Sequence, residues 1–300
     1  MKLYQPSTIK ELRNIFGFQF TKSLGQNFLI DKNTIDRIVE GVGTDLETLV
    51  LEIGPGIGVI TGELAEDACK VVAIEIDQDL IPILAFTLKD CPNVEVVNQD
   101  VLKTDLNKLV KDKIDELKQI DSEIGLNRGY KVKIVGNLPY YITTPIIMKI
   151  FEEGVNAESI TVMMQKEVAD RIKAGPGTKA YGTLGLTVQY YAEVEKIVDV
   201  PRTCFMPNPK VDSTVIKLKP YKEKPVKCQS EEYLFKVIKA SFNQRRKTLT
   251  NSLMGVEGIT KEIVKESLSE AGIDPIRRGE TLTLTEFADL SDIIFEKMKG

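Results

Sequence analysis

The sequence contains no histidine, and this absence excludes several kinds of catalytic site. Nucleophile pairs of the Ser-His and Cys-His type need an imidazole, and most protein metal sites use one as a ligand. Only four cysteines occur, Cys69, Cys91, Cys204 and Cys228, and no two of them have Cys-x-x-Cys spacing. Neither a zinc site nor a disulfide framework is therefore indicated, and we expect no bound metal.

Long apolar runs are missing as well. No stretch of the sequence approaches the ~20 apolar residues that a membrane-spanning helix needs. The first residues mix charged and apolar side chains, which a signal peptide does not do. We therefore expect a soluble, cytoplasmic protein without a membrane partner.

An excess of positive charge is also lacking. The 40 basic and 44 acidic residues give a net charge of -4, which argues against a generic nucleic-acid binder, although an average can hide local basic patches. The chain is 42% hydrophobic and 28% charged, a globular composition. Its 300 residues suggest one large domain and a smaller one.

Short apolar runs that alternate with helical patterns predict an α/β domain with a Rossmann-like parallel sheet. Two later apolar segments are expected to pair antiparallel with each other. The charged stretch between residues 106 and 128 is expected to be an exposed helical crossover without chemistry. The expected strands are 49–53, 71–77, 94–97, 130–135, 159–165, 194–200 and 211–218, and the expected helices include 6–16, 33–41, one beginning near Val59, 144–153 and 181–192.

After a Pro- and Lys-rich linker the pattern becomes wholly helical. We expect helices at 230–242, 244–254, 260–271 and 286–298, and both 8–11 and 283–286 match the capping-box pattern. The chain is thus divided into residues 1–220, an α/β domain, and residues 221–300, a small α-helical domain. The basic stretch 242–248 is either a solvated charged face or a phosphate contact.

A glycine-rich turn follows the first predicted strand of the sheet. Gly54-Pro55-Gly56-Ile57-Gly58 lets the backbone approach a ligand at the start of a helix. A dinucleotide fingerprint would need Gly or Ala where Val59 stands, which favours a different nucleoside cofactor. Glu75 lies about 20 residues further on, the separation expected of an acid that binds ribose hydroxyls. Asp100 follows the third strand, either as an acceptor for a cofactor amino group or as part of a plain turn.

The motif Asn137-Leu138-Pro139-Tyr140 follows another strand and combines an amide, a carbonyl ahead of proline and an aromatic ring. The Asn137 side-chain oxygen and the Leu138 carbonyl could each accept one hydrogen from an adenine N6, aiming its lone pair outward. Tyr140 offers a face on which a planar base can stack. By itself the tetrapeptide also fits a simple turn after a strand.

Phe205 lies in a stiff loop with two prolines, so it is either a buried anchor or a second stacking face for the same base. The segment 22–29 alone indicates only a loop with one buried phenylalanine.

Together these features resemble the small-subunit ribosomal RNA adenine dimethyltransferases, which make two adjacent N6,N6-dimethyladenosines near the 3′ end of 16S rRNA. The resemblance covers nearly the whole chain. It is carried by Leu24-Gly25-Gln26-Asn27-Phe28-Leu29, Glu52 to Gly58, Glu75, Asp100, Asn137 to Tyr140, Phe205 to Ser213, and Asn243 to Lys247.

The resemblance implies a class I methyltransferase sheet, S-adenosyl-L-methionine as cofactor, and 16S rRNA in the small ribosomal subunit or its precursor as partner. It implies a monomer and a role in subunit assembly, with the helical domain recognising rRNA. Asn137, Leu138, Pro139, Tyr140 and Phe205 would be catalytic. The implied cofactor-binding residues are Gln26, Asn27, Leu29, Gly54, Gly56, Gly58, Glu75, Ile76, Asp100, Val101 and Asn137, and the implied RNA-binding residues are Lys22, Lys210, Arg245, Arg246 and Lys247.

Three alternatives remain open. A 23S rRNA adenine methyltransferase of the macrolide-resistance type shares the glycine turn and an Asn-x-Pro-Tyr motif. The chain could instead act mainly as a ribosome-assembly factor that binds immature subunits. A nicotinamide-dependent dehydrogenase is disfavoured by Val59 and by the lack of histidine.

Overall fold

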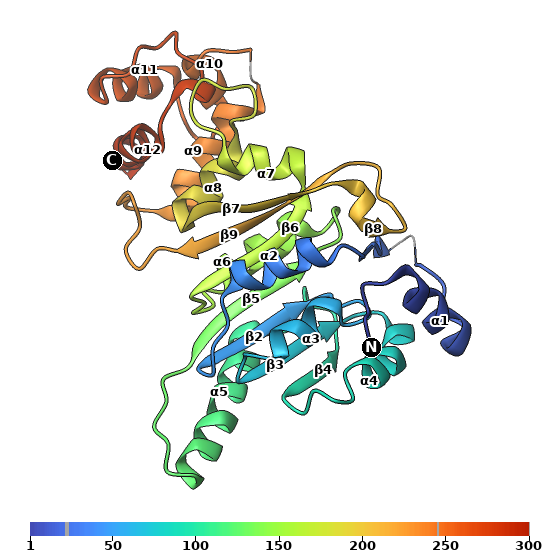
Figure 1. Cartoon of the computed structure of the whole chain (residues 1–300). Coiled ribbons are helices and arrows are strands. Elements are labelled where there is room, and N and C mark those ends of the chain that lie inside the picture. Colours follow the sequence, from blue (N-terminus) through green and yellow to red (C-terminus); the bar gives the residue numbers. More distant parts are fainter. Residues whose placement is uncertain (22–23, 245, 300) are drawn as a thin grey trace. The chain divides into compact units, whose positions relative to one another are not determined.

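The computed structural model describes residues 1–21, 24–244 and 246–299 (Figure 1). The chain forms two compact units, Met1–Ala169 with Glu195–Pro220, and Asp170–Val194 with Tyr221–Gly300. Residues 170–194 thus group with the C-terminal helices, whereas the sequence suggests a single division at residue 220. That the two parts serve as a methyltransferase domain and an rRNA-recognition domain stays a prediction.

The first unit is built on a seven-stranded sheet with the order β4-β3-β2-β5-β6-β9-β7. The strands β4, β3, β2, β5 and β6 run parallel, and β9 is antiparallel to β6. This confirms the predicted Rossmann-like α/β sheet. The strands are β2 (Thr48–Ile53), β3 (Lys70–Glu75), β4 (Val94–Asn98), β5 (Lys131–Asn137), β6 (Ser159–Gln165), β7 (Ala192–Val200) and β9 (Ser213–Pro220).

The strand order reverses between β2 and β5, and this reversal locates the site. The chain runs from β2 outward to β3 and β4, then returns to lay β5 against the other side of β2. In open α/β sheets, ligands bind beyond the carboxyl ends of the strands at such a point. Ile53 pairs with Gly136 in register, so the glycine turn and the Asn137 motif leave neighbouring strands side by side.

Helices and short turns complete the first unit. All six residues of β2 are buried, as expected of a central strand covered on both faces. A two-residue strand, β1 (Phe28–Leu29), pairs antiparallel with β8 (Phe205–Met206). The helices are α1 (Pro6–Phe16), α2 (Lys32–Val42), α3 (Val59–Ala65), α4 (Ile81–Thr87), α5 (Leu106–Glu123) and α6 (Thr143–Glu152), with 3-10 turns at Gln78–Leu80 and Arg202–Cys204. Helix α7 (Lys166–Lys173) begins in the first unit and ends in the second.

The predicted crossover after β4 is the long helix α5, which extends away from the sheet before the chain returns to β5 (Figure 1). The capping box expected at residues 8–11 is wrong, because α1 already begins at Pro6, with Gln5 at the N-cap position and no side-chain cap. Proline at the first helical position starts a helix without needing the side-chain cap further along.

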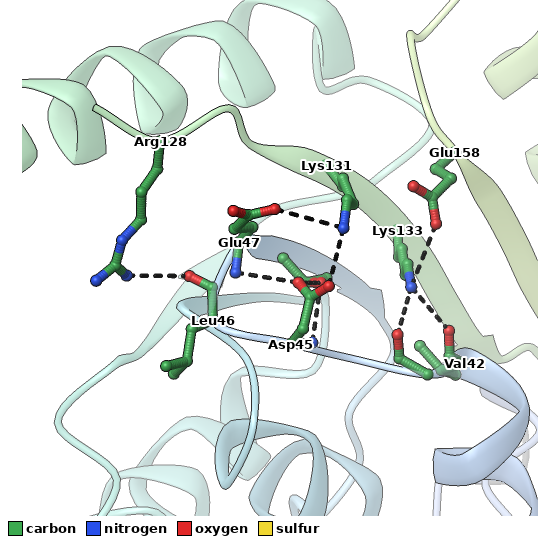
Figure 2. A network of polar contacts seen from close by, with 10 residues as sticks. Val42, Asp45, Leu46, Glu47, Arg128, Lys131, Lys133 and Glu158 are labelled. Carbon is green, nitrogen blue, oxygen red and sulfur yellow. Dashed lines mark hydrogen bonds and ion pairs between the residues drawn. The ribbon is translucent and has the colours of Figure 1, made fainter. Parts of the chain in front are cut away.

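At the amino ends of the strands, opposite the glycine turn, two lysines of β5 contact the segment where α2 ends (Figure 2). The buried Lys133 ammonium donates to the Val42 and Gly43 carbonyls and lies 3.3 Å from a Glu158 carboxylate oxygen. A cation at a helix C-terminus stabilises the unpaired carbonyls there. Lys131 pairs with the Asp45 carboxylate at 2.9 Å. These bonds fix α2 against the sheet, and α2 begins three residues after β1.

The second unit is helical around its own core, which includes the fully buried Leu234 and Phe287. Thr283 and Glu286 form the predicted capping box, with bonds of 3.2 and 2.8 Å between each backbone N–H and the other side chain. The helices are α8 (Thr183–Tyr191), α9 (Glu231–Asn243), α10 (Leu249–Ser252), α11 (Lys261–Glu270) and α12 (Leu284–Lys299), with 3-10 turns at Leu253–Gly255 and Gly279–Thr281.

The helix expected at 244–254 is wrong in its first turn. Lys247 N–H closes a turn onto the Gln244 carbonyl at 2.8 Å, and the helix begins only at Leu249. Across the described ranges, no helix is both long and apolar enough to cross a membrane.

Candidate functional site

A pocket of about 1130 Å³, including its open mouth, lies in the first unit at the carboxyl ends of β2, β3 and β5. Its lining brings together residues from six separate stretches of sequence. Of the residues predicted to bind cofactor or base, those that line the pocket are Gln26, Asn27, Leu29, Gly54, Gly56, Glu75, Ile76, Asp100, Val101, Asn137, Leu138, Pro139, Tyr140 and Phe205.

The orientation of the Asn137 amide is fixed by a contact with the N-terminal segment. Its Nδ2 donates to the Asn27 backbone carbonyl at 3.1 Å. The amide oxygen is therefore the side-chain atom left to accept from a ligand. The Leu138 carbonyl accepts no hydrogen bond from any residue in the described ranges. Two acceptors, one side-chain and one backbone, thus remain available within two consecutive residues.

The backbone of the Asn137 to Tyr140 motif is held in place by side-chain packing and by hydrogen bonds. The Leu138 side chain is 2% exposed and packs against Gly136, where an added Cβ would lie 2.6 Å from Leu138 Cδ2. The Pro139 carbonyl accepts from Ile142 N–H at 3.1 Å and from the Thr143 hydroxyl at 3.0 Å. A glycine is required at position 136 because a larger residue would clash with the Leu138 side chain. The sequence alone did not reveal this requirement.

Two aromatic side chains lie at the same end of the pocket. The Tyr140 hydroxyl is 2.8 Å from Ser213 Oγ, and burial raises its pKa, so the ring is anchored and neutral. Phe205 is only 1% exposed yet lines the pocket. Its backbone pairs with Leu29 through the β1·β8 ladder. Phe205 is therefore both a buried anchor and part of the pocket wall.

The glycine turn depends on conformations and spaces that only glycine provides. Gly56 has φ +62°, and a Cβ there would approach Phe28 Cε1 to 3.1 Å. Gly58 also has positive φ, but a Cβ on it would meet Leu88 rather than the pocket. Among the predicted cofactor-binding residues in the described ranges, only Gly58 does not line the pocket. Its lack of a Cβ lets the start of α3 pack closely against Leu88.

Three carboxylates surround the turn. Glu75, predicted from its spacing, is 5% exposed and accepts from Gly56 N–H at 3.3 Å and Asp77 N–H at 2.8 Å; burial raises its pKa. Asp100 accepts from Leu102 N–H at 3.0 Å, so it forms the plain turn and lines the pocket as well. Glu52 was predicted as part of a strand and of the motif that carries the family resemblance, without a role of its own.

Glu52 is a buried carboxylate in the wall of the pocket. It is 2% exposed, and its Oε2 has no hydrogen-bond partner within the described part of the chain. Burial, together with the nearby charge of Glu75, raises the Glu52 pKa to about 7. An orphaned carboxylate oxygen that borders a pocket is a candidate ligand contact.

The charges of the pocket favour a cationic ligand. Glu52, Glu75 and Asp100 line it, while its described lining contains no lysine or arginine. S-adenosylmethionine carries a sulfonium and an ammonium group, so it fits this set of side chains. The pyrophosphate of a dinucleotide would lie among carboxylates without a cation to balance it.

Gln26 lines the pocket, but its polar atoms are already used. Its Oε1 accepts from Thr21 N–H at 2.9 Å, and its Nε2 donates to Asp77 at 2.5 Å. Asp77, at the end of the predicted strand 71–77, also caps the 3-10 turn that follows, by accepting from Asp79 N–H at 3.0 Å. Through its bond with Gln26, Asp77 therefore holds in place the segment that carries Asn27.

The predicted RNA-binding residues are only partly described. Lys22 and Arg245 lie outside the described residues. Lys210 is exposed in the first unit, and Arg246 and Lys247 are exposed in the second.

Comparison with known proteins places this geometry in context. The family model "Ribosomal RNA adenine dimethylase" matches residues 17–294. The chain is 51% identical over 291 residues to the ribosomal RNA small subunit methyltransferase A of Alkaliphilus metalliredigens, covering 97% of both chains. It is 50% identical to that of Clostridioides difficile, covering 100% of this chain and 99% of the other.

Solved structures agree on the fold. A dimethyladenosine transferase from Plasmodium falciparum aligns with a TM-score of 0.73 at 24% identity, covering 91% of this chain and 98% of its own. The 23S rRNA methyltransferase ErmE aligns with a TM-score of 0.65 at 28% identity, covering 90% and 100%.

Proposed function

Because the chain belongs to the ribosomal RNA adenine dimethylase family, we propose that it dimethylates N6 of two adjacent adenines near the 3′ end of 16S rRNA. The name shared by relatives that are half identical over their full length supports the small subunit as the source of that RNA. The substrate would be the small subunit or its precursor, and methylation would accompany subunit assembly in the cytoplasm.

The pair of free acceptors at Asn137 and Leu138 carries the proposal. An adenine N6 is a poor nucleophile because its lone pair is delocalised into the ring. If the Asn137 Oδ1 and the Leu138 carbonyl each accept one N6 hydrogen, the nitrogen is drawn toward tetrahedral geometry and its lone pair is exposed. The fixed direction of the Asn137 amide supports this role, because no reorganisation is needed when the base arrives.

Removal of the N6 proton needs no specialised residue of the protein. Once methylated, N6 loses a proton readily, so no strong general base is required, in accord with a chain that lacks histidine. A monomethylated N6 retains one hydrogen, so the second transfer engages only one of the two acceptors. Loss of either acceptor is therefore expected to affect the two transfers unequally.

The aromatic walls would hold the base. A stacked adenine cannot present N6 in line with the methyl donor, so the nucleotide must be extruded into the pocket. The anchored ring of Tyr140 and the buried face of Phe205 would sandwich it.

S-adenosylmethionine is the methyl donor of this enzyme family, and when bound it supplies an electrophilic methyl group. Glu75 would accept from its ribose hydroxyls, because its carboxylate oxygens keep lone pairs beyond their bonds to Gly56 and Asp77. Asp100 would accept from its adenine amino group. Glu52 would face its positive charge.

RNA phosphates would be bound by exposed basic residues, since the described lining of the pocket contains carboxylates and no lysine or arginine. The exposed Lys210, Arg246 and Lys247, with Lys22 and Arg245, would make these contacts. They would give orientation rather than sequence specificity. The small subunit would be bound by a monomer of this chain.

The test is methyl incorporation by the purified protein into small-subunit particles from a strain lacking it, compared with protein-free 23S rRNA. We expect dimethyladenosine only in 16S rRNA, located by mass spectrometry of nuclease fragments. Because ErmE aligns over most of this chain, the second candidate is 23S methylation, and incorporation into 23S rRNA alone would establish it. Particle binding without methylation of either RNA would favour a pure assembly factor.

A further inference from the structure

Tyr141 is an exposed aromatic residue at the mouth of the pocket, and the proposed chemistry leaves it without a role. Its side chain is 59% exposed, yet it belongs to the pocket lining. In the described part of the chain it makes no hydrogen bond, ring contact or cation-π contact. Its ring does not contribute to the core, so its loss costs little folding free energy.

The position of Tyr141 follows from the two segments beside it. It comes directly after Tyr140, whose hydroxyl is anchored to Ser213. Its Cε1 atom lies 3.8 Å from where a Cβ on Gly25 would be, so the ring edge lies beside the N-terminal segment that borders the pocket. Tyr141 thus stands at the mouth of the pocket, one residue beyond the ring that would face a bound base.

We propose that Tyr141 is an outer stacking platform that takes the base of the nucleotide adjacent to the target adenine. This inference rests on the proposed function and specifies how its RNA substrate is held. An extruded nucleotide remains covalently joined to its neighbours, so an adjacent base must lie at the mouth of the pocket when the target is inside. An exposed ring without a partner offers that base a face, and every base has a face that stacks.

The adjacent base in the proposed substrate is the second adenine. While one adenine occupies the pocket, the other rests on Tyr141, and the two exchange places between reactions. A purine stacks over more area than a pyrimidine, so the platform favours a target followed or preceded by another purine. Tyr141 would then act on substrate affinity and on completion of both modifications, with little effect on the transfer step itself.

The test compares Tyr141→Leu, which keeps an apolar side chain of similar size, with Tyr141→Phe, which keeps the ring. Substrates are small-subunit particles reconstituted with 16S rRNA whose 3′ segment is ligated from synthetic RNA. One version carries both adenines, and the other carries an abasic site in place of the neighbour. Urea unfolding of each variant verifies that stability is unchanged.

On the substrate with both adenines, we expect Tyr141→Leu to raise KM by roughly 5- to 100-fold with kcat within about twofold, and Tyr141→Phe to match wild type. On the abasic substrate the Leu variant and wild type should have the same KM. If the Leu variant loses the same factor on both substrates, or Phe fails as badly as Leu, the platform is refuted. If wild type methylates neither substrate, the proposed function fails instead.

Discussion

The side-chain amide of Asn137 donates to the backbone carbonyl of Asn27 across 3.1 Å, joining residues 110 positions apart in the sequence. This single bond does two things. It leaves the amide oxygen as the side-chain atom free to accept from a ligand, and it ties the N-terminal segment to the end of β5. The acceptor pair and the wall beside it therefore form together, and disturbing either one should affect both.

Glu52 should make both the free energy of unfolding and the affinity for the cofactor depend on pH near neutrality. Because its pKa of about 7 lies above the ordinary 4.5, the stability that its protonated form provides is present below pH 4.5 and lost as the pH rises through 7. Glu52→Gln should therefore be more stable than wild type at pH 8 by up to about 3 kcal/mol, with a smaller difference at pH 5. Urea unfolding of the ligand-free proteins measures this.

A cationic ligand favours the ionised carboxylate, so wild-type affinity for S-adenosylmethionine should rise between pH 5.5 and 7.5. Calorimetry should show that this dependence is flattened in Glu52→Gln, while the exposed Glu123→Gln behaves like wild type. Equal pH dependence in both variants would mean that Glu52 does not meet the ligand.

Gly56→Ala should impair both folding and cofactor binding. The new Cβ would be strained by φ +62° and would press on Phe28 at 3.1 Å. Gly125 has φ +73° with nothing within 4 Å, so Gly125→Ala is a matched control for backbone strain alone, which costs about 1–2 kcal/mol. Gly56→Ala should be less stable than this control and should bind S-adenosylmethionine at least tenfold more weakly. Similar stability and affinity in both variants would show that the contact with Phe28 has no consequence.

Asp77→Ala should weaken cofactor binding without removing a direct contact. It deletes the acceptor for Gln26 Nε2 and releases the segment that carries Asn27. A hydrogen bond to a charged group contributes about 1.5–3 kcal/mol, so we expect the Kd for S-adenosylmethionine to rise roughly 10- to 100-fold. Asp79→Ala, an exposed neighbour, should leave the Kd unchanged. An unaltered Kd in Asp77→Ala would show that the bond between Gln26 and Asp77 does not support cofactor binding.

The sheet and the pocket residues could be predicted because their signals are local. Buried parallel strands are continuous apolar runs, and the residues that follow them gather at one edge of the sheet, so Gly56, Glu75 and Asn137 could be placed together from sequence alone. The capping box at Thr283 was also readable, because both partners lie within four residues.

The remaining features depend on contacts between distant parts of the chain. Nothing near Glu52 in the sequence indicates that its Oε2 is left unpaired, because only the folded structure shows which donors lie within reach. The pairing of Leu29 with Phe205 spans two residues per strand, too few for any periodic pattern. The bonds of Gln26 to Asp77 and of Asn137 to Asn27 are likewise determined by the tertiary structure.

The central claim is that neutral acceptors at Asn137 and Leu138 activate an adenine N6, and the most direct measurement is single-turnover methylation of small-subunit particles by Asn137→Ala at saturating S-adenosylmethionine. We expect the rate of dimethyladenosine formation to fall about 10²- to 10³-fold with particle binding within about threefold of wild type. The exposed Asn156→Ala should react like wild type. A wild-type rate in Asn137→Ala would contradict the account.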